Sequence, residues 1–190
     1  MTSRLSLSSA HDLELVALGA AGEQAAFGEL ARRHGSAVRG LVRRMGADAA
    51  GADDVAQDAF LVAFERISDF RGEGAFRAWV MKIAARHYAR RWRREARNAL
   101  IASAEAPDEG AAAFAADDRI DLEEAMRSLT EAERVCVCLC YGAGFSHAEA
   151  AGALNAPLGT VKSHVKRGVD KLKARLAPLG GRGIGSEASG

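Results

Sequence analysis

The chain has 190 residues, which is room for one domain or for two small ones. Hydrophobic residues make up 48% of it and favour folded cores over disorder, while a formal net charge of +1 excludes a bulk attraction to nucleic acid. The sequence has neither an apolar run of membrane-spanning length nor the apolar core of a secretory signal near its start. We therefore expect a cytoplasmic protein without membrane insertion.

A first helical block is predicted over residues 12–97, after an N-terminal tail of residues 1–11. Apolar residues recur there at helical spacing in three stretches, which begin near Phe27, Val55 and Phe76. Breaks between helices are expected at Gly35, 46–51 and 69–74. This pattern is typical of a small helical bundle.

Acidic residues are concentrated at the start of the second stretch, between Asp53 and Asp58. Asp53 or Asp54 is placed to cap a helix or to charge its N-terminus favourably. Asp54 and Asp58 lie one helical turn apart and repel each other slightly, which suggests that they meet a basic partner surface.

Basic and aromatic residues alternate in the third stretch, between Phe76 and Arg97, where Glu95 is the single acidic residue. Basic groups can follow a nucleic-acid backbone, and aromatic rings can stack on unpaired bases, so the segment suggests a grip on melted DNA. The alternative is an ordinary core stripe beside a solvated basic end. We expect Trp79 in the core, because it lies on the apolar stripe, and expect Trp92 to be less buried among its arginines.

A flexible acidic linker is expected over residues 98–118, and a second helical block over residues 119–178, followed by a disordered tail at 179–190. In the second block, the stretches Thr130–Glu133 and Ser146–Glu149 both have the capping-box pattern, which marks a helix start. The fold class predicted from both blocks is all-α, with two small helical domains.

The end of the second block has a helix-turn-helix pattern. A capped helix over 146–154 is followed by a break at Asn155–Pro157 and a helix over 157–176, with an apolar stripe from Leu158 to Leu176. The other side of the last helix offers donors for bases and phosphates, namely Thr160, Lys162, Ser163, Lys166, Arg167, Lys171 and Lys173. An amphipathic helix with a solvated basic face is the alternative, but the capped helix and turn before it favour DNA binding.

The three cysteines, Cys136, Cys138 and Cys140, lie within one short helical stretch. Helical spacing puts Cys136 and Cys140 on one face and Cys138 away from it. Structural zinc sites usually have four ligands with a different spacing, so we interpret the thiols as small buried hydrophobes. We expect no metal, no cofactor and no catalytic residue set.

Several motifs together resemble the extracytoplasmic-function (ECF) sigma factors of bacterial RNA polymerase, over about Leu13 to Leu176. The matching stretches, in chain order, are 26–30 (AFGEL), 52–60 (ADDVAQDAF), 70–79 (FRGEGAFRAW), 129–134 (LTEAER) and 157–164 (PLGTVKSH). Each motif is moderately specific, and their order makes the resemblance highly specific. Two departures are Arg86, where family members often have asparagine, and His164, where a basic residue is usual.

The resemblance implies a role for each block. Residues 12–97 would be sigma region 2, which docks on the clamp helices of core RNA polymerase through Asp54, Gln57 and Asp58. The same region would recognise and melt the −10 element through Arg71, Arg77, Lys82, Arg86, His87, Arg90, Arg91, Trp92 and Arg94. Residues 119–178 would be region 4, which contacts the polymerase flap and reads the −35 element through Thr160, Lys162, Ser163, His164, Lys166 and Arg167.

The implied partners are core RNA polymerase, promoter DNA and an anti-sigma factor. The chain would supply promoter specificity and would not itself be an enzyme. One alternative is a stand-alone helix-turn-helix regulator, which leaves the arginine-rich segment unexplained. Another is a thiol or metal sensor built on the cysteine helix.

Overall fold

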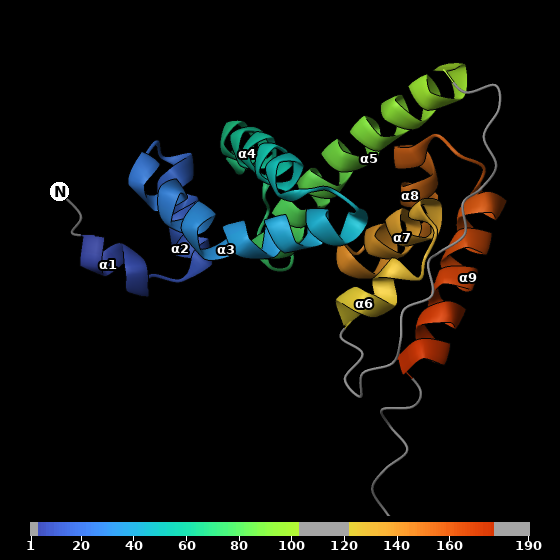
Figure 1. The fold of residues 1–190 in the computed structure, drawn as a ribbon. Helices are drawn as coiled ribbons and strands as arrows, with labels where there is room; N and C mark the ends of the chain where they lie inside the picture. Colours follow the sequence, from blue (N-terminus) through green and yellow to red (C-terminus); the bar gives the residue numbers. More distant parts are fainter. Residues whose placement is uncertain (1–3, 103–121, 177–190) are drawn as a thin grey trace, which may run out of the picture.

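The computed structural model describes residues 4–102 and 122–176, and all regular structure in these ranges is helical (Figure 1). The first domain comprises α1 (Arg4–Ser9), α2 (Asp12–Ala20), α3 (Gln24–Met45), α4 (Ala49–Glu65), the 3₁₀ turn η1 (Ile67–Asp69) and α5 (Phe76–Ala102). The second domain comprises α6 (Leu122–Arg127), α7 (Glu131–Val137), the π-helical turn η2 (Cys138–Gly142), α8 (His147–Leu154) and α9 (Leu158–Leu176). The predicted all-α class with two small helical domains is confirmed.

Helix α3 is the centre of the first domain and packs against α2, α4 and α5. Its buried face includes Leu30, Val38 and Leu41, which recur at the spacing of an amphipathic helix. The predicted break at Gly35 is wrong, because α3 runs through it without interruption. A single glycine costs a helix only about 1 kcal/mol, less than burial of the apolar face contributes.

Arg33 fastens the N-terminal helix α1 to α3. Its guanidinium donates to the backbone carbonyls of Leu7, Ser8 and Ala10 at 2.9, 2.9 and 2.8 Å. It also forms an ion pair of 3.0 Å with Asp12. The predicted tail at residues 1–11 therefore contains a docked helix, in which Leu7 is buried. So short a helix has no apolar period long enough to be predicted from the sequence.

Aromatic rings fix the start of α5. Phe76 is fully buried, and its ring centroid lies 6.5 Å from that of Phe27 and 5.7 Å from that of Trp79. Phe70, at the end of η1, packs 5.5 Å from Trp79. The predicted core position of Trp79 is confirmed, since the ring is half-buried against this cluster.

The second domain follows the predicted caps. The hydroxyls of Thr130 and Ser146 each accept a hydrogen bond from the backbone N–H of the third residue of the next helix, and the glutamate at that position accepts one from the cap residue's N–H. Both capping boxes are therefore confirmed. Asn155 adopts the left-handed conformation (φ 50°) and turns the chain from α8 into α9. Val161 and Val165 are buried as expected, whereas Leu158, at the start of the stripe, is 42% exposed.

The expected boundary between the domains shifts. Helix α5 continues to Ala102, so residues 98–102 are helical rather than part of an extended linker. Alanine and leucine dominate this end of the helix, and both are strong helix formers. The rest of the expected linker, 103–118, and the tail, 179–190, lie outside the described residues. Within the described ranges, no helix is long and apolar enough to cross a bilayer.

Helices α3 and α5 of the first domain contact the second domain. Helix α3 meets α7 and η2, while α5 meets α8. Leu41 of α3 reaches Gly142 at the end of η2. The second domain is therefore held against the basic helix α5, which Figure 1 shows rising between α4 and α8.

Candidate functional surfaces

Helix α4 is capped by Asp48, which had not been predicted for this role. Its Oδ1 accepts a hydrogen bond of 2.7 Å from the backbone N–H of Gly51. The predicted cap at Asp53 or Asp54 is wrong, because both lie inside α4. Asp53 instead lies 3.6 Å from Nε of Arg39. The helix end needs neither residue, so the exposed carboxylate of Asp54 has no capping role.

The structure places the predicted docking residues Asp54, Gln57 and Asp58 together on the exposed side of α4. Two large apolar side chains continue that side along the helix, Leu61 with 56% exposure and Phe64 with 37%. We call these five residues the α4 face. Sequence reasoning missed Leu61 and Phe64, although Leu61 lies seven residues after Asp54, a spacing that returns to the same helix face.

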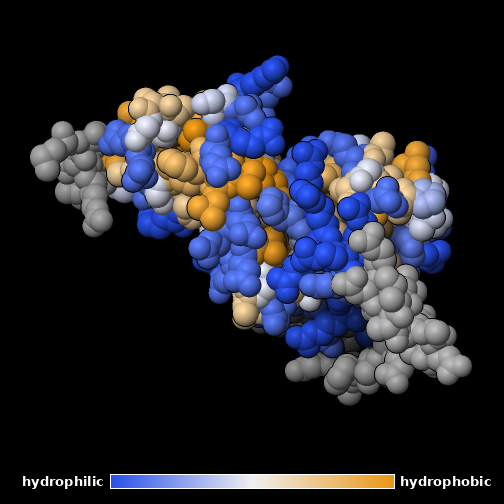
Figure 2. All heavy atoms as spheres, turned by 90° about the horizontal axis from the view of Figure 1, so that it is seen from above, coloured by the Kyte–Doolittle hydropathy of each residue, from blue (hydrophilic) through white to orange (hydrophobic). Residues whose placement is uncertain are grey.

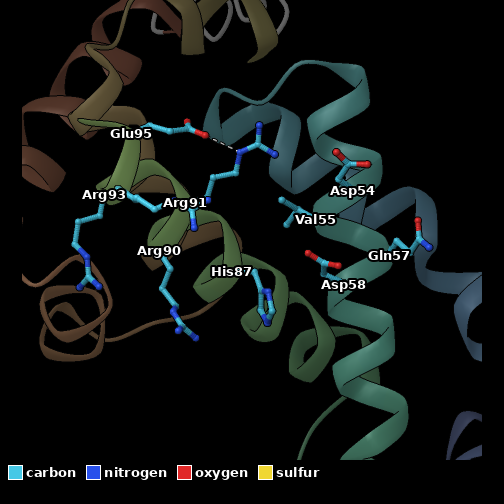
Figure 3. Close-up of a pocket in the computed structure, with 10 residues that line it drawn as sticks. Asp54, Val55, Gln57, Asp58, His87, Arg90, Arg91, Arg93 and Glu95 are labelled. Atoms are coloured by element: carbon cyan, nitrogen blue, oxygen red, sulfur yellow. Dashed lines mark hydrogen bonds and ion pairs between the residues drawn. The ribbon is translucent and has the colours of Figure 1, made fainter. Parts of the chain in front are cut away.

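A hollow of about 840 Å³ separates the α4 face from α5 (Figure 3). Asp58 and His87 face each other across it, with the arginines of α5 along the other wall. Arg91 donates to Glu95 at 2.8 Å, and this hydrogen bond first, then the charges of Asp54 and Asp48, raise the pKa of Arg91. Helix α5 therefore already supplies positive charge to the α4 carboxylates.

The predicted −10 residues of α5 fall on different sides of that helix. His87, Arg91 and Arg94 line the hollow beside α4, whereas Lys82 and Arg86 lie against the second domain. A second hollow is lined by residues of α4, α5 and α8, and both His87 and Arg90 line the two hollows. Arg71 and Arg77 are exposed near the first turn of α5. Figure 2 shows the result as a hydrophilic band between the two lobes of the molecule.

Trp92 differs from its neighbours in α5. The ring is half-buried and packs against the core, so the expectation of low burial is wrong. Its Nε1 atom is buried and has no hydrogen-bond partner within the described part of the chain. The apolar period of α5 continues through the arginine-rich stretch, which explains why Trp92 turns inward.

The second domain presents the predicted −35 residues on α9. Thr160, Lys162 and Ser163 are exposed at the N-terminal end of the helix. The Ser163 hydroxyl donates to the Gly159 carbonyl at 2.9 Å, and Lys166 pairs with Asp170 at 2.9 Å. Thr160 and Lys162 make no side-chain hydrogen bond or ion pair with any residue of 4–102 or 122–176, so their side chains are available to a partner.

Arg167 and His164 are tied to the domain itself. Arg167 lies 3.4 Å from the buried carboxylate of Glu133 and 3.0 Å from Nδ1 of His164. Partial burial first, and then the neighbouring charge of Arg167, lower the pKa of His164. At neutral pH His164 is therefore uncharged, and it differs in this respect from the basic residue usual in the family.

The cysteines lie at the junction of α7 and η2. Cys136 and Cys138 are buried and Cys140 is half-buried. Burial raises the pKa of Cys136 to about 12 and that of Cys138 to about 11, so both thiols are protonated at neutral pH and weakly reactive. Cys138 lies within electrostatic reach of Arg44 in the first domain and of Arg134 in α7. In residues 4–102 and 122–176, no group of His, Cys, Asp and Glu side chains is arranged to hold a metal ion.

Comparison with known proteins assigns both domains. The family model for sigma-70 region 2 matches residues 30–98, and that for sigma-70 region 4 matches residues 119–172. The chain is 32% identical to the RNA polymerase sigma factor NccH of Alcaligenes xylosoxydans, over 87% of this chain and 94% of NccH. It is 31% identical to the ECF RNA polymerase sigma factor SigE of Mycolicibacterium smegmatis, over 83% of this chain and 65% of SigE.

Solved structures agree with this similarity. The structure of CnrH in complex with the cytosolic domain of CnrY matches with a TM-score of 0.51 and 30% identity, over 88% of this chain and 97% of CnrH. CnrH is an RNA polymerase sigma factor of Cupriavidus metallidurans. The sigma factor RpoE of Bartonella quintana, solved with the anti-sigma factor NepR, shares the fold at 23% identity and a TM-score of 0.51, over 80% of this chain and 96% of RpoE.

Proposed function

The chain belongs to the ECF family of RNA polymerase sigma factors and directs transcription initiation, and we propose how its surfaces divide that work. The α4 face docks on core polymerase, α5 and the loop before it bind the −10 element, and α9 reads the −35 element. The observation that carries this proposal is the presence of two exposed polar helix faces, one in each matched region, on helices whose other sides build the cores.

The α4 face suits a partner with both basic and apolar surface. Asp54 and Asp58 offer two carboxylates, and Leu61 and Phe64 offer apolar area that is costly to leave in water. Charged groups at an interface steer association, while a central apolar anchor contributes most of the affinity. The clamp helices of core polymerase are the partner that the family resemblance implies for this position.

The −10 element is assigned to the exposed arginines at the start of α5 and in the loop before it. Gly72 and Gly74 both have positive φ (76° and 88°), so this loop uses backbone conformations that other residues rarely adopt. Arg71 and Arg77 lie in and just after it and are exposed. These arginines, together with Lys82, Arg86 and Arg90 further along α5, bind the phosphate backbone of the melted strand in this proposal.

The −35 element is assigned to the N-terminal half of α9. Thr160, Lys162 and Ser163 supply the donors for base edges and phosphates, as expected of a recognition helix. Lys166 follows one turn later as a phosphate contact. Arg167 contributes mainly by fixing the helix to Glu133, which holds the recognition residues in place.

We also propose the remaining partners. An anti-sigma factor is one of them, since RpoE of Bartonella quintana was solved with the anti-sigma factor NepR and CnrH was solved with the cytosolic domain of CnrY. The polymerase is cytoplasmic, which places this chain there. The polymerase also supplies the chemistry of RNA synthesis, so the chain needs no cofactor of its own.

Pull-down of core polymerase tests this assignment most simply. The tagged full-length chain should retain the polymerase core subunits, without DNA and after a wash at moderate salt. A stand-alone helix-turn-helix regulator would bind duplex DNA yet retain no polymerase. That result would overturn the sigma-factor division of work proposed for these surfaces.

A further inference from the structure

Phe145 and Glu149 of the second domain lie against two cations of α5. The Phe145 ring is buried, and its centroid lies 5.6 Å from Nζ of Lys82 and 5.5 Å from Cζ of Arg86. Glu149, in the first turn of α8, places its Oε1 atom 3.6 Å from the same Nζ of Lys82. An aromatic ring therefore contacts both cations, and a carboxylate from the same segment contacts one of them, Lys82.

This pair of groups resembles the groups that a nucleotide presents. An unpaired nucleotide offers a flat ring for cations to stack on and a phosphate to pair with them. Phe145 supplies the ring and Glu149 the negative charge, and both reach the side chains that we assigned to −10 DNA. While these contacts last, Lys82 and Arg86 cannot make the equivalent contacts to a DNA strand.

We propose that the second domain closes over the −10 surface of the first by this mimicry of a nucleotide, so that free chain binds single-stranded DNA poorly until the domains separate. The proposal rests on the assignment of Lys82 and Arg86 to −10 DNA made above. Its distinctive content is that Phe145 competes with the DNA strand for Lys82 and Arg86, and that Glu149 competes with it for Lys82.

The contact is part of a closely packed interface between the two domains, which we call the seam. At Gly142, an added Cβ would lie 2.6 Å from Cδ1 of Leu41, a fully buried residue of α3. At Gly46, an added Cβ would lie 2.9 Å from the guanidinium of Arg134 in α7. Glycine thus allows close approach on both sides of the seam, and α8 is held on α5 at the same time.

Opening the seam by substitution tests the proposal. In Gly142→Leu the new side chain meets Leu41 across the seam, while no second-domain atom beyond the chain neighbours and the local backbone of η2 lies within 4 Å of the added Cβ. The matched control is Gly28→Leu, on the exposed side of α3, where nothing lies within 4 Å. Each full-length protein is measured by small-angle scattering for its radius of gyration, and by fluorescence anisotropy for binding of a short, labelled, random-sequence single-stranded DNA.

We expect Gly142→Leu to enlarge the radius of gyration and to tighten DNA binding, while Gly28→Leu matches the parent. If about nine-tenths of the free chain is closed, full opening tightens the apparent affinity about tenfold. A Gly142→Leu protein with the parent's radius and affinity, or one that expands without binding DNA more tightly, overturns the proposal.

A second pair of variants separates the mimicry from general loosening. Glu149→Gln keeps a side chain that can hydrogen-bond the Ser146 N–H and so retains the α8 cap, but it removes the charge beside Lys82. Glu65→Gln removes an equal charge from an exposed site on α4. Glu149→Gln should tighten DNA binding more than Glu65→Gln, and equal effects would contradict the proposed role of Glu149.

The DNA assignment itself is checked separately. The double variant Lys82→Ala, Arg86→Ala should lose promoter-dependent transcription with core polymerase. If it transcribes like the parent, the assignment of these cations to −10 DNA fails, and the proposal fails with it. If it loses transcription while Gly142→Leu leaves DNA binding unchanged, the assignment stands and only the closure is wrong.

Discussion

Lys171 and Glu133 join the recognition helix to the rest of its domain. Nζ of Lys171 donates to Oε2 of Glu133 at 2.7 Å, and the Glu133 side chain is only 4% exposed. The same carboxylate accepts from the Thr130 backbone N–H at 3.1 Å. One buried carboxylate therefore caps α7 and anchors α9, which couples the start of region 4 to the helix assigned to the −35 element.

This coupling predicts how stability depends on pH. Burial, the largest influence, raises the pKa of Glu133, but the hydrogen bond from Lys171 and those with Thr130 outweigh it and hold the pKa below its ordinary value of 4.5. A lowered folded-state pKa means that the stabilisation is present above 4.5 and is lost as pH falls through the folded-state value. Chemical denaturation across this acidic range should show the loss.

The variant Glu133→Gln isolates that contribution. Glutamine keeps the cap but not the charge. We therefore expect the free energy of unfolding to fall by an amount on the order of 2 kcal/mol at neutral pH, as for hydrogen bonds to charged groups. The difference from the parent should shrink as the pH falls below 4.5, the ordinary value for this carboxyl. A difference that stays constant across this range would contradict the ionic role of Glu133.

Lys162 and Arg167 are expected to act differently on −35-dependent initiation. Lys162→Ala removes an exposed donor from α9, so it should weaken promoter binding without changing the melting temperature. If the contact is to a phosphate, the slope of log affinity against log salt concentration falls in magnitude by about one, and binding to all sequences weakens equally. Competition binding to duplex promoters over a range of salt concentrations measures this change. If Lys162→Ala binds the promoters as tightly as the parent does, this face does not contact DNA.

Arg167→Ala removes an interaction with Glu133 and should therefore lower stability as well as DNA binding. Because the Arg167 side chain is 55% exposed, we expect a stability loss of at most about 1 kcal/mol. Lys171→Ala serves as the matched variant, since it breaks the shorter contact to the same carboxylate. Unchanged stability in both variants would contradict the anchoring role of Glu133.

Charge reversal tests the α4 face. Asp54→Arg with Asp58→Arg should abolish binding to core polymerase while circular dichroism and the melting temperature stay near those of the parent, because both side chains are exposed. Asp170→Arg is the matched control, since Asp170 is an exposed carboxylate of α9 that lies outside the α4 face. Binding is measured with immobilised core enzyme, and parental affinity in the double variant would rule out this docking face.

The cysteines should matter for packing alone. Replacing Cys136, Cys138 and Cys140 by serine buries hydroxyl groups, each at a cost of about 1–3 kcal/mol where no partner is found. Cys140→Ser alone should cost less, because that residue is half-buried. Denaturation midpoints measure these losses, and transcription by the folded variants should equal that of the parent. Stoichiometric metal in the native protein would contradict this interpretation.

Local rules predicted the parts of the fold that depend on a few adjacent residues. The capping boxes at Thr130 and Ser146 and the helix-turn-helix pattern could be read directly, because the groups that make them are close in sequence. The family resemblance supplied the docking and DNA-binding residues, and the structure brings Asp54, Gln57 and Asp58 onto one exposed side.

Features that depend on tertiary packing could not be predicted in this way. Helix α1 is held by Arg33, more than twenty residues further along the chain, and Gly35 stays helical because α3 is buried on several sides. The contact of Phe145 with α5 likewise follows from how helices pack. None of these has a local sequence signal.

Run-off transcription tests the central claim most directly. Core RNA polymerase is combined with the purified full-length chain and a library of promoter fragments from the same genome, and transcript starts are mapped. The account predicts discrete starts that require the chain and share −10 and −35 elements, with Asp54→Arg, Asp58→Arg as the inactive control. No enrichment over core polymerase alone, from protein that is folded and retains core enzyme, would contradict it.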